Sequence, residues 1–226
     1  MSSGCEKGDS SLETSASASR PPRSVALVNA AGCIGAGNDA CNSIAFLLDD
    51  FEEAYRAYAH EMAQMFGVSD DVTTPRFVRM APQGDDAFAA HAECGSVVIG
   101  YALEADEDAA GSIANAVRLL SPVDASRGMR VYAIAVDHSY DAENALVSLD
   151  ALRVSCSEAG LLFSGGVLIG GGALLPRLVN KPRMGVARRR VSEATDELIE
   201  AVREGRDAGV IKAKPPIPRF LYNRLL

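Results

Sequence analysis

The sequence predicts an α/β fold, in which a parallel sheet lies between two layers of helices. Two observations predict this fold class. Short, almost continuously apolar runs, typical of strands buried on both faces, alternate with longer segments whose apolar residues recur at helical spacing. Strands separated by helices pair in parallel through right-handed crossovers, which places helices on both faces of the sheet. We therefore expect a three-layer sandwich with five parallel strands, at residues 24–29, 76–80, 96–103, 129–136 and, ending in a Gly-rich turn, 161–172.

The first strand and its helix are predicted from residues 24–66. The apolar strand is followed by a loop of small and polar residues, which is typical of a connection between a strand and a helix. From Ser43 to Phe66, large apolar side chains recur every three or four residues and define one helical face, which we interpret as core. Because Asn and Ser are common N-cap residues, we expect the helix to open on Asn42 and Ser43.

The same periodicity predicts four more helices, and glycines mark where two of them end. Gly160 and Gly205 follow helical segments, as glycine does where a chain leaves a helix in the left-handed conformation. The run Gly170-Gly171-Gly172 is interpreted as a place of close backbone packing or a tight turn rather than a ligand site. The four helices are expected at 84–93, through 113–120, from after residue 140 to 158, and at 188–203.

The two ends of the chain differ from its body. Residues 1–23 are rich in Ser, Gly and Thr and are expected to be a flexible tail. Residues 24–208 are expected to form the single domain. Residues 209–226 are expected to be an extension that packs on the domain or on a partner, with an extended, Pro-rich segment from Lys214 and an apolar end.

The composition narrows the function classes. Apolar residues make up 48% of the 226 residues, which is ample for one core, and the formal net charge of −8 argues against nucleic acid as the main partner. The five cysteines are dispersed without a CxxC pair, which argues against a disulfide framework and a zinc site. No apolar run reaches the length of a membrane span, and no signal peptide is found, so we expect a cytoplasmic protein that does not bind a membrane.

Ligands of open parallel sheets bind beyond the carboxyl ends of the strands, where the strand order reverses. Three predicted loops lie at that edge: 30–42, 101–111 and 137–140. The first loop could present backbone N–H groups and the positive end of a helix to a phosphate. It could equally be a plain connection whose Asn-Ser pair only caps a helix.

Two other chemistries are compatible with single residues at this edge. His138, beside Asp137, could act as a general base, but no nucleophile elbow accompanies it. Cys33 and Cys41 flank the first loop, and a thiol near a helix N-terminus can be reactive, although a free cysteine is more often a small buried side chain. We expect no metal site and assign no catalytic side chain.

A series of motifs in the C-terminal half has a familiar order. An apolar strand end, an Ala-Leu pair, Cys, Gly-Leu, Gly-Gly and Ile-Gly-Gly-Gly follow one another, and Pro-Arg-Phe-Leu-Tyr comes near the end. Over about residues 24–224 the chain resembles the NAD(P)H-dependent FMN reductase-like proteins, which implies a flavodoxin-like fold with strand order 2-1-3-4-5. The matching positions are 133–136, 145–146, 156, 160–161, 165–166, 169–172 and 218–222, with 29–31 and 41–43 similar to the family's first loop.

The loops that would contact flavin depart from the family pattern. The family's phosphate-loop serine falls near Ala31, and its Pro-Arg pair is absent. Four acidic residues within 104–108 follow the third strand, where the family often has an aromatic residue and a Pro-bearing turn, and they would repel an anionic flavin. The family's Asn-x-Gly-Phe appears as residues 137–140.

The resemblance implies an FMN-binding oxidoreductase that uses NAD(P)H to reduce flavin, a quinone or another small electron acceptor, and that forms a homodimer. The altered loops favour a second function, a flavodoxin-like domain that has lost flavin and serves as a binding or interaction module. Under the first function, the first loop holds the phosphate and Tyr140 stacks on the flavin ring. The expected cofactor contacts are Asn29, Ala31, Cys33, Gly35, Asn42, Ser43, Tyr101, Ala102, Asp137, His138, Ser139 and Tyr140.

Overall fold

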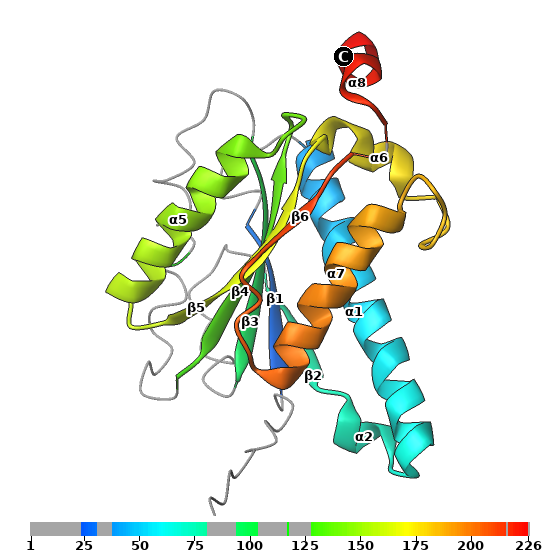
Figure 1. Ribbon diagram of the computed structural model, residues 1–226. Coiled ribbons are helices and arrows are strands. Elements are labelled where there is room, and N and C mark those ends of the chain that lie inside the picture. The colour runs from blue at the N-terminus through cyan, green and yellow to red at the C-terminus, as the bar shows by residue number, and fades with distance from the viewer. Residues whose placement is uncertain are drawn as a thin grey trace, which may run out of the picture.

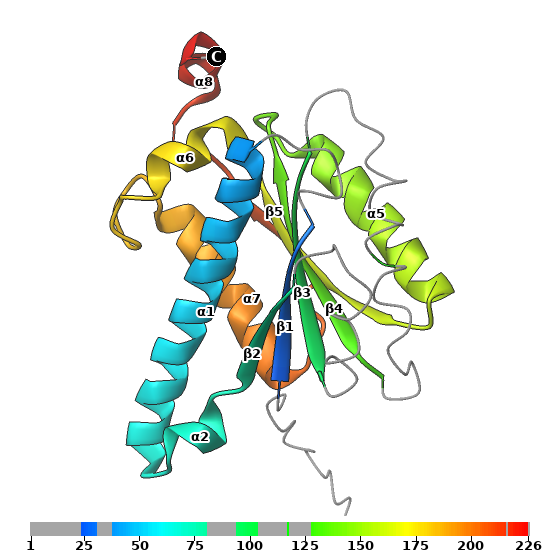
Figure 2. The ribbon, with the colours of Figure 1, turned by 180° about the vertical axis from the view of Figure 1, so that it is seen from behind.

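The computed structural model describes residues 24–30, 38–80, 94–103, 117, 128–215 and 217–225. These residues form a parallel sheet of six strands with helices on both faces (Figures 1 and 2). The strand order is β2-β1-β3-β4-β5-β6, and every neighbouring pair is parallel. This is the flavodoxin-like topology with one more strand at its edge. The strands are β1 (Ser24–Asn29), β2 (Arg76–Met80), β3 (Ser96–Leu103), β4 (Arg130–Asp137), β5 (Leu162–Ile169) and β6 (Val210–Ala213).

Four of the predicted strands are confirmed to within one residue at each end, and the fifth ends earlier than the Gly-rich segment that we assigned to it. Strand β6 is the difference. Only four residues long, it pairs with β5 from Gly166–Val210 to Ile169–Ala213. Its residues alternate between exposed and buried, as on an edge strand, and so short an alternation is a weak sequence signal.

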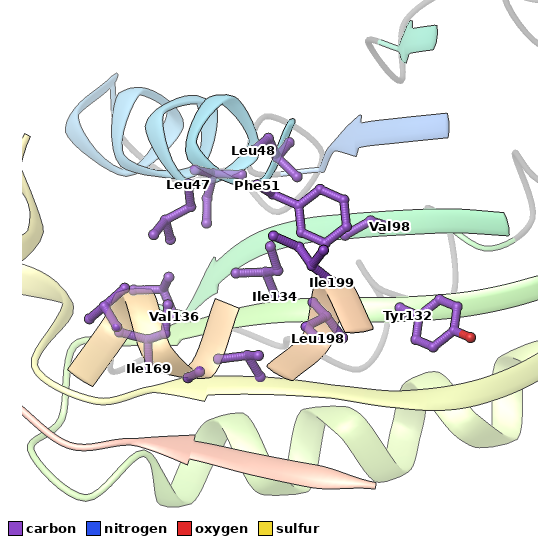
Figure 3. Packing of buried hydrophobic residues seen from close by; sticks show 14 of the residues in the cluster. Leu47, Leu48, Phe51, Val98, Tyr132, Ile134, Val136, Ile169, Leu198 and Ile199 are labelled. Atoms are coloured by element: carbon purple, nitrogen blue, oxygen red, sulfur yellow. The ribbon is translucent and has the colours of Figure 1, made fainter. Parts of the chain in front are cut away.

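The described helices lie on both faces of the sheet. Helices α1 (Asn38–Phe66) and α7 (Arg189–Glu204) lie side by side on one face, and α5 (Glu143–Glu158) lies on the other (Figures 1 and 2). Figure 3 shows Phe51 of α1, Ile134 of β4 and Leu198 of α7 in the space between the helices and the sheet, in the larger of two apolar clusters among the described residues. Short elements complete the described chain: α2 (Asp70–Thr73), a 3₁₀ turn (Gly172–Leu174), α6 (Leu175–Leu178) and α8 (Arg219–Leu225).

Helix α1 begins earlier than predicted, and this corrects the expected helix opening. Its first residue is Asn38, so Asn42 and Ser43 lie inside the helix. Ala40 is buried and begins the apolar stripe that continues through Ile44, and Asp39 stands in the first turn, where a negative side chain is favourable. Because alanine is small, this first position of the stripe did not stand out in the sequence.

The C-terminal segment is also not extended throughout, as was expected from Lys214 onward. Residues Arg219–Leu225 form helix α8, in which Tyr222 is 2% exposed. The backbone N–H groups of Leu221 and Tyr222 both donate to the carbonyl of Pro218, so the last proline starts the helix. A helix of two turns is too short to show a period in the sequence.

Some predicted segments fall outside the described residues: the tail 1–23, the helix 84–93, the acidic residues 104–108 and the segment 113–120 apart from Val117, which is helical and buried. Within the part of the chain that the structure describes, no helix has the length and apolar character needed to cross a bilayer.

Candidate functional site

The strand order reverses between β1 and β3, at the edge where all strands present their carboxyl ends (the upper edge in Figure 1). The strands do not end level. Asn29, the last residue of β1, pairs with Gly100, whereas β3 continues to Leu103, which pairs with Asp137 of β4. The first loop therefore leaves the sheet at a step below the ends of β3 and β4, at the position where ligands of such sheets bind.

Asn29 joins the end of β1 to the start of α1. Its side-chain amide Nδ2 donates to the carbonyl oxygen of Cys41 at 3.2 Å. The backbone N–H of Ala30 donates to the carbonyl of Gly100 at 2.8 Å, which continues the ladder one residue beyond the strand. These two bonds fix the N-terminal turn of α1 next to the strand end.

The remaining residues predicted in the first loop are dispersed. Asn42 is exposed and Ser43 is buried, and both belong to the interior of α1 rather than to its first turn. The predicted contacts Ala31, Cys33 and Gly35 lie outside the described residues.

Tyr101 and Ala102 of β3 are directed into the two core layers. Tyr101 is fully buried on the α5 side, and its hydroxyl lies 2.9 Å from Ser148 Oγ. Since the Ser148 hydroxyl donates to the carbonyl of Ala145, Tyr101 is the donor to Ser148. Burial raises the pKa of Tyr101 above its ordinary value. Ala102 belongs to the cluster on the α1 side, so this pair supports the layers on either side of the sheet.

Asp137 organises the turn that follows β4. It is buried, and its two carboxylate oxygens accept backbone N–H groups, Oδ1 from Ser139 at 2.7 Å and Oδ2 from Ala145 at 3.1 Å. The second bond lies in the first turn of α5, where a negative charge is stabilising. The carboxylate thus shapes the loop 137–142, and Ala142 takes the left-handed conformation with φ of 54°.

The loop after β4 is held by the C-terminal segment. The Tyr140 hydroxyl donates to the carbonyl of Ile217 at 3.0 Å, and the Tyr222 hydroxyl donates to the carbonyl of His138. The two tyrosine rings meet edge to face, with centroids 5.6 Å apart. Arg219 pairs with Asp141 at 2.9 Å. We call Tyr140, Asp141, Ile217, Arg219 and Tyr222 the C-terminal clasp.

Glycines at the end of β5 make this arrangement possible. A Cβ atom on Gly171, whose φ is 70°, would lie 2.6 Å from Pro215 Cγ and 3.2 Å from the Tyr222 ring. A Cβ atom on Gly170 would lie 2.3 Å from the carbonyl oxygen of Tyr140. The predicted close packing of the Gly-Gly-Gly run is confirmed. The segments that pack against these glycines, the loop after β4 and the C-terminal segment, were not predicted.

The structure therefore brings Asn29, Asp137, His138, Ser139 and Tyr140 to one edge of the sheet. It adds Ile217, Arg219 and Tyr222. The sequence signal for Arg219 and Tyr222 was the motif Pro-Arg-Phe-Leu-Tyr, and Ile217 directly precedes that motif. Among the described residues, no group of three or more His, Cys, Asp or Glu side chains is placed to hold a metal ion.

Comparisons with protein-family models, curated proteins and solved structures gave no significant match to this chain. The flavodoxin-like fold is therefore assigned from the topology of the sheet.

Proposed function

We propose that this protein is an FMN-binding oxidoreductase that takes hydride from NAD(P)H and passes electrons to flavin, a quinone or another small acceptor. The observation that carries the proposal is the bond between Asn29 and Cys41. It fixes the N-terminus of a 29-residue helix at the point where the strand order reverses. A helix N-terminus offers unpaired N–H groups and a partial positive charge, which together suit a phosphate.

The loop after β4 supports the same function as a platform for a planar ring. Asp137 ties its own turn to α5, and the C-terminal clasp ties the loop to α8, so its backbone groups have fixed directions. When bound, the flavin would supply the redox chemistry, while the chain supplies binding, orientation and electrostatics. Preorganised backbone groups suit that role because no ordering cost arises on binding.

A second function is favoured by the two tyrosines. The hydroxyl of Tyr101 is hydrogen-bonded to Ser148. The hydroxyl of Tyr140 is hydrogen-bonded within the C-terminal clasp, and its ring contacts Tyr222. Tyr101 is fully buried and Tyr140 is half-buried, and these contacts hold both side chains within the fold. The alternative is therefore a flavodoxin-like domain that binds a protein or small molecule without flavin.

The visible spectrum of the purified protein and an FMN titration distinguish the two functions. Under the first, FMN binds saturably at micromolar concentration, and the protein with FMN oxidises NADPH or NADH. Asn29→Ala should weaken FMN binding about tenfold, the order of one hydrogen bond to or near a charged group. Asn42→Ala is the matched control: it removes an exposed amide from the same helix and should leave the affinity unchanged.

A colourless protein without saturable FMN binding would reject the first function and leave the second. If Asn42→Ala weakened binding as much as Asn29→Ala, the phosphate would lie along α1 rather than at its first turn, and our placement of the site would be wrong.

A further inference from the structure

A cavity of about 530 Å³ lies between α1, α7 and the segment that precedes α7. It is on the face of the sheet opposite α5, where α1 and α7 run side by side (Figures 1 and 2). Its volume is within the range of small-molecule sites. None of its lining residues belongs to the three loops of the candidate flavin site.

Two arginines and two aspartates are linked at this cavity. Asp50 Oδ1 forms an ion pair with Arg188 Nη2 at 2.5 Å and accepts a hydrogen bond from Arg183 Nε at 3.2 Å. Arg183 also reaches Asp196 of α7, with 2.5 Å between Nη2 and Oδ1. Asp50 and Arg188 are 5% and 8% exposed, which is unusual for charged residues. All four residues line the cavity.

One acceptor and one donor of this group are left without a hydrogen-bond partner among the described residues: Asp50 Oδ2 and Arg188 Nε. Rotation of the Arg188 guanidinium into a two-bond pairing with Asp50 is opposed by its other contacts. The guanidinium lies over the Phe46 ring at 4.4 Å, and Nη1 donates to the carbonyl of Lys181 at 3.3 Å. A buried polar atom without a partner costs free energy, so this pair is suited to a group that brings both a donor and an acceptor.

The charged residues around the cavity indicate whether the bound group is positive or negative. Four carboxylates line it, and only two guanidinium groups oppose them, so its formal charge is −2. Glu53 and Glu61 are both exposed and are the uncompensated pair. An anion is therefore repelled, and a cation is attracted.

We propose that this cavity binds a small organic cation with a carbonyl or hydroxyl oxygen next to its ammonium group, as in an amino alcohol or the amide of a basic amino acid. The ammonium pairs with the Asp50 carboxylate, and the oxygen accepts from the Arg188 guanidinium. Because Asp50 Oδ2 and Arg188 Nε have almost no accessible surface in the free protein, binding includes a shift of these two side chains toward the cavity. Any further positive charge on the ligand lies near Glu53 and Glu61. This site is independent of flavin binding.

Isothermal titration of the full chain with L-argininamide tests the proposal, with putrescine and acetate as comparison probes. L-Argininamide should bind saturably with a dissociation constant in the millimolar range or below, and more weakly as salt is raised. Putrescine has two ammonium groups but no oxygen acceptor. It should bind about tenfold more weakly, because Arg188 Nε is left without a partner. Acetate should not bind.

Asp50→Asn is the sharpest variant, because it keeps the shape of the side chain but removes its negative charge and makes one terminal atom a donor. It should weaken argininamide binding at least about tenfold. Since loss of a buried charge partner can also unfold the protein, the double variant Glu53→Gln/Glu61→Gln changes only exposed residues and should weaken binding several-fold. Glu143→Gln on α5, across the sheet, is the matched control and should bind as wild type does.

Three results would overturn the proposal. The first is that the wild-type chain does not bind argininamide saturably. The second is that wild type and the double variant bind it equally. The third is that acetate binds and argininamide does not.

Discussion

Tyr140 and Tyr222 each donate a hydrogen bond to the backbone of the segment that carries the other. The Tyr140 hydroxyl, from the loop after β4, reaches Ile217 of the C-terminal segment, and the Tyr222 hydroxyl, from α8, reaches His138 of the loop. Because the rings also meet edge to face and Arg219 pairs with Asp141, the two segments are joined by these four contacts within a few residues. The C-terminal helix is thereby attached to the same loop that the proposed function uses as a platform.

Substitution of Tyr222 should loosen this attachment. Tyr222→Phe keeps the ring and removes the bond to His138, so we expect the free energy of unfolding to fall by about 1 kcal/mol in urea denaturation. Tyr222→Ala also removes the ring and should make the bonds after Arg219 and Arg224 accessible to trypsin in the native protein. Phe220→Ala is the control, because Phe220 is 71% exposed and should have little effect. Unchanged stability in both Tyr222 variants would show that the C-terminal clasp does not stabilise the fold.

The positions of the strands were largely predictable, because they depend on apolar runs within each short segment of the sequence. Strand β3 is an uninterrupted apolar run, and its eight residues are all buried in the sheet. Strand β6 was not predictable, because four residues with alternating exposure resemble many loops and its pairing depends on β5, far away in the sequence. The same holds for Tyr101: an apolar run does not tell which core layer a given side chain faces.

The candidate site was predictable only where a residue follows directly from a strand end. Asn29 and Asp137 end β1 and β4, so their place at the carboxyl edge follows from the strand bounds. The positions of Asn42 and Ser43 depended on where the helix starts. That start was not predicted, because Ala40, the first buried residue of the stripe, is small. The contacts of Tyr140 depended on residues about 80 positions later in the chain, which no local pattern reveals.

Tyr101 should give the protein part of its sensitivity to alkali. Burial holds the folded-state pKa of Tyr101 above its ordinary value of 10.0. Below pH 10.0 the phenol is neutral in both states and its stabilisation is fully present. Above that pH the unfolded chain ionises while the folded chain does not, so stability is lost as pH rises toward the folded-state pKa.

Urea denaturation at a series of pH values tests this. Tyr101→Phe should cost about 1 kcal/mol at neutral pH, through loss of the bond to Ser148, and should lose less stability than wild type above pH 10. Burial also raises the pKa values of Tyr55 and Tyr132, so the slope should flatten rather than vanish. An unchanged slope would show that Tyr101 is solvated in the folded protein.

Gly165 tests whether β6 belongs to the sheet. Its φ is 90°, and a Cβ atom there would lie 2.2 Å from the carbonyl oxygen of Gly209, directly before β6. Gly165→Ala must therefore displace backbone, and we expect a loss of about 3 kcal/mol or more in the free energy of unfolding. Gly209→Ala is the matched control: its φ is 62°, but nothing lies within 4 Å of the added atom. It should lower the free energy of unfolding by only about 1 kcal/mol, because alanine is less favourable than glycine in the left-handed conformation. Equal losses would mean that β6 is not held against β5.

Asp39 should weaken the binding of any phosphate at the first turn of α1. Its carboxylate is exposed in that turn, where it stabilises the helix but places a negative charge beside the proposed phosphate position. Asp39→Asn removes the charge and keeps the size of the side chain. We expect FMN to bind two- to five-fold more tightly, which corresponds to roughly 0.3–1 kcal/mol for a charge at a helix terminus, and the gain should shrink as salt is raised.

The control for this variant is Asp71→Asn, in the first turn of α2. It makes the same change of charge at a helix start that lies near the other end of α1 (Figure 2). FMN affinity should not respond to it, because the distance exceeds the screening length at physiological salt, about 8 Å. If both variants tightened FMN binding equally, only net charge would be acting, and the first turn of α1 would have no special role. If Asp39→Asn weakened FMN binding, the carboxylate would contribute to the site, and the phosphate would have to lie elsewhere on the carboxyl edge.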